Sequence, residues 1–217
     1  MTHSPLSLLD RRALLAGLAA LASGPALGAT AKRPVVTILG DSITAGLGLS
    51  AADALPARLQ AALAKIGSPA LVRGAGVSGD TISGGLARLD FSVQADTDVC
   101  VVALGGNDLL QGQDTRASKA NLDKIVRRLK ARKIGVVVAG LVAPPQIGKG
   151  YARDYDAMFP AVAKAEGVAL YPDLRRGVAG RRDLTQADGI HPNAAGVLII
   201  AAGLAPVVAR ALKAHRA

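Results

Sequence analysis

Short apolar runs alternate with longer segments of helical spacing along most of the chain, and this alternation limits the fold more than any other feature. The runs are rich in Val and Ile and occupy residues 35–39, 70–72, 99–104, 134–142 and 168–171. Strands that are buried on both faces have this composition, because helices cover both sides of a parallel sheet. The chain is therefore predicted to form an α/β fold around a parallel sheet.

The segments between these runs have the spacing of helices that bury one face. Leu55, Leu59 and Leu63 repeat every fourth residue, and Asp114 or Thr115 is placed to cap a further helix. The predicted helices occupy residues 51–66, 79–89, 115–129, 151–166 and 192–213. Residues 32–217 contain no internal repeat, low-complexity tract or linker, so we predict a single domain.

The first 31 residues have the pattern of a secretory signal peptide. Arg11 and Arg12 precede the uncharged run "ALLAGLAALA", and Ala29-Thr30-Ala31 supplies an A-x-A cleavage site. The protein is therefore predicted to be exported and to be periplasmic or secreted after cleavage. The adjacent arginines are typical of a twin-arginine signal; an ordinary Sec signal that carries two arginines is the alternative.

Composition excludes several other classes of protein. The aromatic share is only 2%, which argues against single-stranded nucleic-acid binding by base stacking. Removing residues 1–31 takes away two arginines and one aspartate, which lowers the net charge from +10 to +9. That charge predicts a weak attraction to anionic membrane surfaces. Cys100 is the only cysteine, so a cysteine-rich metal site is excluded. We also predict no cofactor and no obligatory protein partner.

Four small polar loops follow the predicted strands or precede the last helix. They are Gly40-Asp41-Ser42, the segment 74–80, Gly105-Gly106-Asn107-Asp108, and the segment 188–192. In parallel α/β sheets, ligands bind beyond the carboxyl ends of the strands. These loops are therefore the candidate site.

His191 is the candidate general base. His3 lies in the predicted signal, and His215 is near the C-terminus, where chains usually fray. Asp188 precedes His191 by three residues, close enough through a turn to accept a hydrogen bond from one ring nitrogen. A carboxylate that orients an imidazole is two thirds of a hydrolase triad.

Ser42 has two interpretations from its position alone. A serine at a strand-to-helix turn commonly caps the helix. As a nucleophile, it would lie at the positive end of a helix, where backbone N–H groups can hold an oxyanion. Asp41 is interpreted as structural, because it is not itself part of a D-x-D pattern of the kind that aspartyl phosphotransfer would need.

Two of the other loops also have competing interpretations. "GAGVSG", residues 74–79, fits the dinucleotide-binding pattern G-x-G-x-x-G, but the preceding strand is short and no acidic residue stands at the end of the next strand. The N–H of Gly79 could instead face an oxyanion. Asn107 is either a turn residue or a neutral hydrogen-bond donor to the same oxyanion.

The loops together resemble those of the SGNH, or GDSL-type, hydrolases, and most of all the bacterial periplasmic thioesterase I, lysophospholipase and arylesterase group. The matching blocks are "LGDSITAGLG", "SGDTISGGLARL", "LGGNDLL" and "DGIHPN", in that order within residues 35–197. The resemblance implies a three-layer α/β/α sandwich with a five-stranded parallel sheet. It also implies a triad of Ser42, His191 and Asp188, and an oxyanion hole made by Ser42, Gly79 and Asn107.

The activity implied by the resemblance is that of a serine esterase on acyl esters or thioesters, of small-molecule or lipid type. A carbohydrate or peptidoglycan O-acetylesterase could use the same site, and a lipid- or glycan-binding module with an inactive triad is a further alternative. The absence of G-x-S-x-G argues against the common α/β-hydrolase elbow. One departure is Gly74, where the relatives carry Asn.

Overall fold

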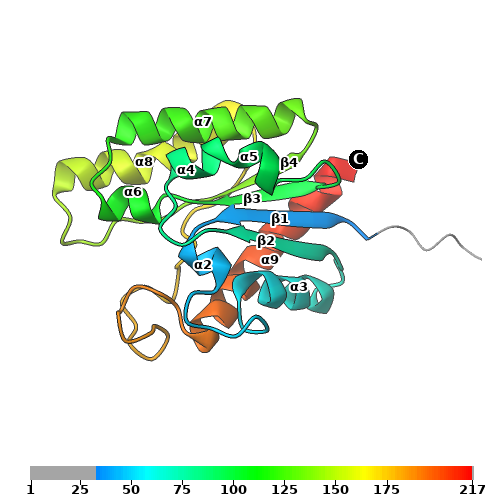
Figure 1. The fold of residues 1–217 in the computed structure, drawn as a ribbon, viewed down its shortest axis with the longest axis horizontal. Coiled ribbons are helices and arrows are strands. Elements are labelled where there is room, and N and C mark those ends of the chain that lie inside the picture. Colours follow the sequence, from blue (N-terminus) through cyan, green and yellow to red (C-terminus); the bar gives the residue numbers. More distant parts are fainter. Residues whose placement is uncertain (1–32, 217) are drawn as a thin grey trace, which may run out of the picture. The chain divides into compact units, whose positions relative to one another are not determined.

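The computed structural model describes residues 33–216, and the predicted signal peptide lies outside them. Its centre is a sheet of five parallel strands in the order β2-β1-β3-β4-β5 (Figure 1). The strands are β1 Val35–Gly40, β2 Leu71–Gly76, β3 Val99–Ala103, β4 Gly135–Ala139 and β5 Ala169–Tyr171. The predicted five-stranded parallel sheet is confirmed.

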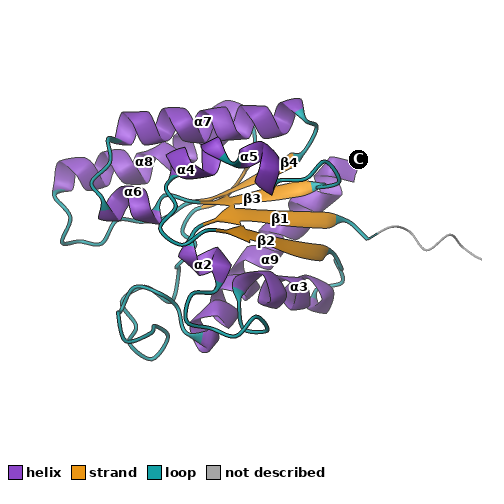
Figure 2. Ribbon diagram, viewed as in Figure 1, coloured by secondary structure: helices purple, strands orange, loops and turns teal. Residues whose placement is uncertain are grey.

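Helices cover both faces of this sheet, which gives the predicted three-layer arrangement (Figure 2). On one face α3 packs against α9, and on the other α7 packs against α4 and α8. The helices are α2 Ser42–Ala45, α3 Leu55–Lys65, α4 Ile82–Ala87, α5 Leu89–Ser92, α6 Gly106–Leu110, α7 Thr115–Ala131, α8 Lys149–Glu166 and α9 Ala194–Arg216.

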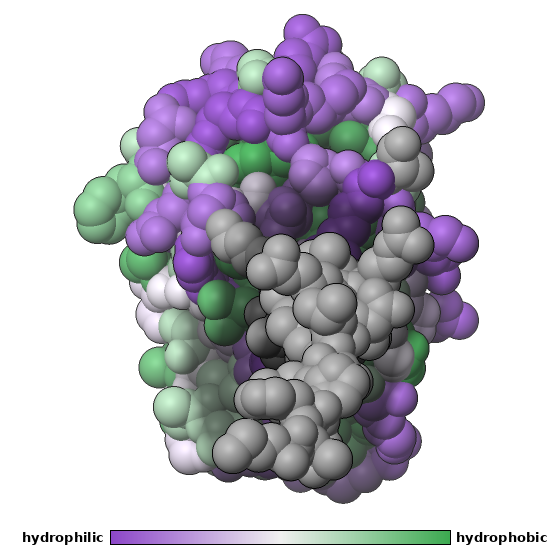
Figure 3. All heavy atoms as spheres, turned by 90° about the vertical axis from the view of Figure 1, so that its right-hand side faces the viewer, coloured by the Kyte–Doolittle hydropathy of each residue, from purple (hydrophilic) through white to green (hydrophobic). Residues whose placement is uncertain are grey.

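The central strands explain the apolar runs in the sequence. Every residue of β1 and β3 is buried, because each strand has a neighbour on both sides and helices on both faces. Helix α7 buries only one side, through Ser118, Leu122, Ile125, Val126 and Leu129. Figure 3 shows the outer side of the α7 layer, at the top of the view, as a hydrophilic surface.

Strand β2 is longer than predicted. The sequence indicated residues 70–72, but the strand runs to Gly76, and Gly74 pairs with Ile38 of β1. At this edge of the sheet most side chains are only partly buried, so backbone pairing extends without an apolar run. The dinucleotide interpretation of residues 74–79 therefore loses its loop, because Gly74 and Gly76 are strand residues.

The structure also gives a reason for the glycine at position 74. A Cβ there would lie 2.7 Å from Cγ of Pro56, in the first turn of α3. Any larger residue would push α3 away from β2. Gly74 thus accompanies a close contact between α3 and β2.

Helix α9 begins later than predicted. Pro192 pairs with Thr185 in an isolated bridge, and the helix starts after Asn193, whose side-chain oxygen accepts a hydrogen bond from Gly196 N at 3.0 Å. Asn193 therefore caps α9, and Pro192 lies before the helix. By length and composition α9 could cross a membrane. In the fold it packs against α3 and the sheet, which accounts for its apolar character.

Two other helix boundaries differ from the prediction. The predicted helix 79–89 is two short helices, α4 and α5, joined at Arg88. Asn107 was predicted in a loop, but it lies in the short helix α6. Of the two predicted caps, Asp114 or Thr115, Asp114 is the cap, since its carboxylate accepts a hydrogen bond from Ala117 N at 2.8 Å.

Candidate active site

A cavity of about 750 Å³ lies at the carboxyl end of the sheet, and all four candidate loops contribute to it. Ser42 follows β1, Gly79 follows β2, Asn107 follows β3 and His191 precedes α9. The strand order brings these loops together although they are far apart in the sequence. The location agrees with the general rule for parallel α/β sheets.

Ser42 is the first residue of α2, and it does not cap that helix. Asp41 is the cap, because its Oδ1 accepts a hydrogen bond from Ile43 N at 3.0 Å. The capping interpretation of Ser42 is therefore wrong. Its hydroxyl, which is nearly buried, instead lies 2.8 Å from Nε2 of His191.

His191 is held by Asp188 within a single turn. Nδ1 of His191 lies 2.6 Å from Oδ2 of Asp188, and Oδ1 of Asp188 accepts hydrogen bonds from the backbone N–H groups of Ile190 and His191. The His191 ring bond, followed by these two backbone bonds, lowers the pKa of Asp188 to about 2. Asp188 is therefore an anion at neutral pH and can only accept hydrogen bonds.

The charge of Asp188 assigns the direction of the hydrogen bonds. Nδ1 of a neutral His191 must carry the proton, because Asp188 has none to donate. Nε2 is then an acceptor, and the Ser42 hydroxyl donates to it. This is the arrangement that a serine nucleophile needs to lose its proton to a base.

Gly79 and Asn107 line the same cavity as Ser42. Gly79 has φ +84°, a conformation that residues with a side chain rarely adopt, and this turns the backbone after β2. One N–H of the Asn107 amide donates to the backbone oxygen of Asp80 at 2.9 Å. Because the amide carries two N–H groups, the second is left for a ligand.

Asp41 also lines the cavity, and its carboxylate is almost fully buried. Burial raises its pKa to about 6, against the opposing hydrogen bond from Ile43 N and the charge of His191. The folded protein therefore retains a proton on Asp41, between about pH 4 and 6, that the unfolded chain has lost.

This raised pKa of Asp41 predicts a pH-dependent stability. The contribution of Asp41 to the free energy of unfolding should be largest below about pH 4, fall as the pH rises to about 6, and stay constant above that. Asp41→Asn removes the titration but keeps an oxygen for Ile43 N. Its free energy of unfolding relative to wild type should increase by about 2–3 kcal/mol from pH 4 to pH 7. Urea unfolding at both values measures this, and a pH-independent difference would contradict the assignment.

Asp108 was not singled out from the sequence, although it is fully buried. Its two oxygens accept hydrogen bonds from Ile82 N at 2.9 Å and from the Ser118 hydroxyl at 2.6 Å. These bonds connect α6 to α4 and α7. Asp108 is thus a structural anchor beside Asn107, outside the wall of the cavity.

Arg88 is a second residue that sequence reasoning missed, although it is the last but one residue of the block "SGDTISGGLARL". Its guanidinium donates to the carboxylate of Asp80 at 2.7 Å, to the backbone oxygen of Ala75 at 2.9 Å and to that of Gly40 at 2.8 Å. Gly40 ends the strand before Ser42, and Asp80 follows Gly79. One side chain therefore joins the Ser42 loop to the Gly79 loop.

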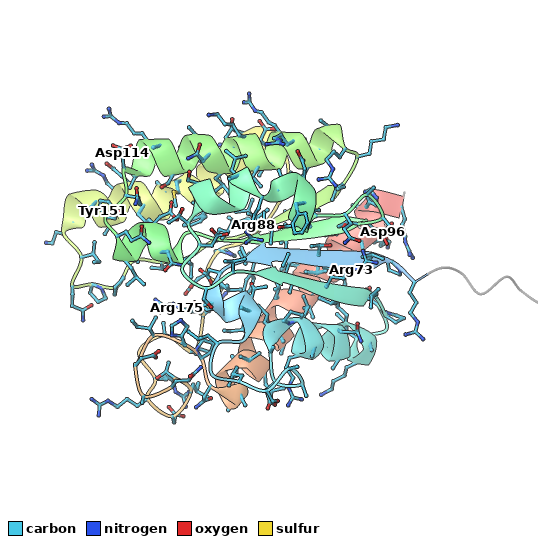
Figure 4. The ribbon with its side chains drawn as sticks, in the orientation of Figure 1. Arg73, Arg88, Asp96, Asp114, Tyr151 and Arg175 are labelled. Atoms are coloured by element: carbon cyan, nitrogen blue, oxygen red, sulfur yellow. The ribbon has the colours of Figure 1, made fainter. Side chains whose placement is uncertain are left out.

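These contacts make Arg88 a positioning residue. Arg88→Gln should lower kcat by about 10- to 100-fold with a smaller change in KM. Displacing an N–H donor of the oxyanion hole reduces the stabilisation of the transition state more than the binding of the substrate. Arg73→Gln is the matched control, since Arg73 forms a similar ion pair with Asp96. Figure 4 shows Arg73 and Asp96 toward the opposite end of the sheet from Arg175. Equal kinetic losses in both variants would overturn the positioning role of Arg88.

Comparisons with known proteins place this chain among esterases and lipases. Residues 38–198 match the GDSL-like Lipase/Acylhydrolase family. The chain is 38% identical to Esterase TesA of Pseudomonas aeruginosa over 183 residues, which are 84% of this chain and 90% of that protein. It is 35% identical to Thioesterase 1/protease 1/lysophospholipase L1 of Escherichia coli (strain K12) over 164 residues, 75% of this chain and 77% of that protein.

The fold comparison agrees with the sequence comparison. The crystal structure of AlinE4, an SGNH-hydrolase family esterase, is similar with a TM-score of 0.70 and 39% identity, covering 83% of this chain and 97% of that one. The family match covers most of the described residues and includes all four blocks that carry the site. The chain belongs to the GDSL-like lipase/acylhydrolase family, the SGNH hydrolases.

Proposed function

We propose that the protein is a serine esterase that hydrolyses acyl esters or thioesters with Ser42 as nucleophile, His191 as base and Asp188 as the orienting acid. The continuous chain of hydrogen bonds from Ser42 through His191 to Asp188 is the observation that carries this proposal. The esterase and thioesterase names of its relatives support it.

The first half of the reaction acylates Ser42. The Ser42 oxygen attacks the carbonyl carbon while its proton passes to Nε2 of His191, and the charge of Asp188 stabilises the resulting imidazolium. The N–H groups of Ser42, Gly79 and Asn107 stabilise the oxyanion. Collapse of the tetrahedral state releases the alcohol or thiol, which takes the proton from His191.

The second half of the reaction releases the acid. Water enters, His191 removes its proton, and the hydroxide attacks the acyl group on Ser42. Asp188 again holds the ring of His191 in the tautomer that this step needs. Ser42 then regains its proton, and the free enzyme is restored.

The cavity wall supports aliphatic acyl groups longer than acetyl. Much of it is apolar, and a pocket of about 750 Å³ is large enough for a chain of several carbons. Many of its apolar side chains come from α6 and from the segment after β4, among them Leu109, Leu110, Leu141, Val142, Pro144 and Pro145. Leu110 and Val142 are exposed at its rim.

Two measurements test the proposal together. Labelling with a serine-directed phosphonate should modify Ser42, whereas a binding module with an inactive triad would remain unlabelled. A panel of p-nitrophenyl esters and acyl thioesters of increasing chain length should then show hydrolysis, with the longer aliphatic chains preferred over acetyl. Labelling with hydrolysis of the acetyl ester alone would favour an O-acetylesterase.

We also propose that the enzyme works after export. The signal-like pattern in residues 1–31 supports this, with cleavage after Ala31. The amino-terminal sequence of the protein purified from its host would begin near Lys32. An intact amino terminus in the mature enzyme would contradict it.

A further inference from the structure

Arg175 lines the same cavity as Ser42 and His191, in the loop that follows β5. Figure 4 shows it at the α2 end of the sheet, far from Arg73 and Asp96. Its backbone is fixed, because the N–H of Arg175 donates to Oδ1 of Asp173 at 3.0 Å and the N–H of Leu174 donates to Gly140 O at 2.7 Å. The side chain therefore starts from a defined point on the cavity wall.

The guanidinium of Arg175 has no hydrogen-bonded or ion-paired partner among residues 33–216, although the residue is half-buried. The other half-buried arginines of this part of the chain all bind a carboxylate, and they are Arg58, Arg73, Arg88 and Arg132. The donors of a guanidinium that no protein group occupies are available to a ligand. Arg175 is thus the exception, and it is the one of these arginines that lines the cavity.

The nearby acidic groups do not neutralise Arg175 by direct contact. Asp173 is its neighbour in the chain, but the two side chains form no ion pair, and one oxygen of Asp173 is already occupied by the Arg175 backbone N–H. Burial raises the pKa of Asp173, and the charge of Arg175 only partly opposes this. Burial likewise raises the pKa of Tyr155, whose hydroxyl donates to the backbone oxygen of Gly105, against the charge of Arg175. Asp156 is the other carboxylate that acts on Asp173.

From this arrangement we infer that Arg175 is a binding subsite for an anionic group, a carboxylate or a phosphate, carried by the ester substrate. A guanidinium binds either group through two parallel hydrogen bonds, which fixes orientation as well as charge. The inference rests on the proposed esterase function and adds the substrate class. The substrates would combine an aliphatic part for the apolar wall with one anionic group for Arg175.

The test compares substrates that differ only in this charge. In the acyl half, p-nitrophenyl octanoate is paired with mono-p-nitrophenyl suberate, and the corresponding adipate and sebacate pairs vary the reach. In the alcohol half, a monoacylglycerol is paired with the lysophosphatidate of the same chain. The quantity measured is the ratio of kcat/KM for the anionic and the neutral member of each pair.

In Arg175→Gln this ratio should fall by about 10-fold or more in at least one pair, because a charged hydrogen bond is lost. Arg175→Lys keeps the charge but not the bidentate geometry, so it should retain part of the preference for the anionic substrate. Arg176→Gln is the matched control: it removes the same charge one residue away, from an exposed side chain that does not line the cavity, and its ratios should equal those of wild type.

The outcomes separate the subsite from the proposed function. If wild type hydrolyses the neutral esters but every ratio is the same in Arg175→Gln, the subsite is overturned and the esterase proposal stands. Equal falls in Arg175→Gln and Arg176→Gln would also overturn it, because they would indicate only a general field. If no ester of either kind is hydrolysed, the esterase function itself fails.

Discussion

Ser42→Ala and His191→Ala should each lower kcat by about 10⁴- to 10⁶-fold, the loss typical of removing a member of a serine triad. In this protein the two side chains meet at 2.8 Å, so either change breaks the proton path from nucleophile to base. Steady-state hydrolysis of a p-nitrophenyl ester gives kcat, and thermal unfolding shows whether the fold persists.

The double variant sharpens this test. Because the triad acts as a unit, Ser42→Ala combined with His191→Ala should be about as inactive as either single variant. His215→Ala is the matched control, since His215 is an exposed histidine in the last turn of α9. Turnover near the wild-type rate in either single variant would refute the mechanism.

Asn107→Ala should lower kcat by about 10²- to 10³-fold while KM changes little. Negative charge grows on the carbonyl oxygen only as the tetrahedral state forms, so a donor aimed at that oxygen acts mainly on kcat. Asn107→Asp should be at least as poor, because a carboxylate would repel the oxyanion. Steady-state kinetics on one neutral ester separate the two constants.

The bond from Asn107 to Asp80 O needs its own control, because its loss could loosen the Gly79 loop. Ser118→Ala removes the hydrogen bond that the Ser118 hydroxyl donates to Asp108, the residue after Asn107 in α6, and Ser118 does not line the cavity. It should reduce stability but leave kcat within a few fold. A raised KM at unchanged kcat in Asn107→Ala would instead make Asn107 a substrate-binding residue, and a loss of stability alone would make it a structural one.

The sequence located four of the five strands, including the edge strand β5, but predicted only the start of the edge strand β2. The buried runs of β1, β3 and β4 need apolar side chains on both faces, so their composition identifies them. Most of β2 needs only backbone pairing to β1, and its glycines resemble a loop. The start of α9 was also misplaced, because the helix was predicted from residue 192, whereas Asn193 caps it and the helix begins at Ala194.

Within the site, local contacts could be predicted and distant ones could not. Asp188 and His191 are three residues apart, so their hydrogen bond follows from a turn. The resemblance of the four blocks to the family predicted that Ser42, Gly79 and Asn107 share one site, and all three line the same cavity. The role of Arg88 was missed because it depends on a contact with Gly40, which is distant in the sequence. The role of Arg175 was missed because it depends on the cavity that the fold creates and on the absence of a hydrogen-bonded or ion-paired partner for its guanidinium within residues 33–216.

The two links of the Ser42–His191–Asp188 chain have very different separations along the sequence, and this has a consequence for refolding. Asp188 and His191 are three residues apart, whereas Ser42 and His191 are 149 residues apart. The acid–base pair can therefore form with its turn, but the nucleophile gains its base only when the segment before α9 docks against the end of β1. During refolding from denaturant, we expect regained ester turnover to time this last docking event, while far-ultraviolet circular dichroism reports the earlier formation of the helices.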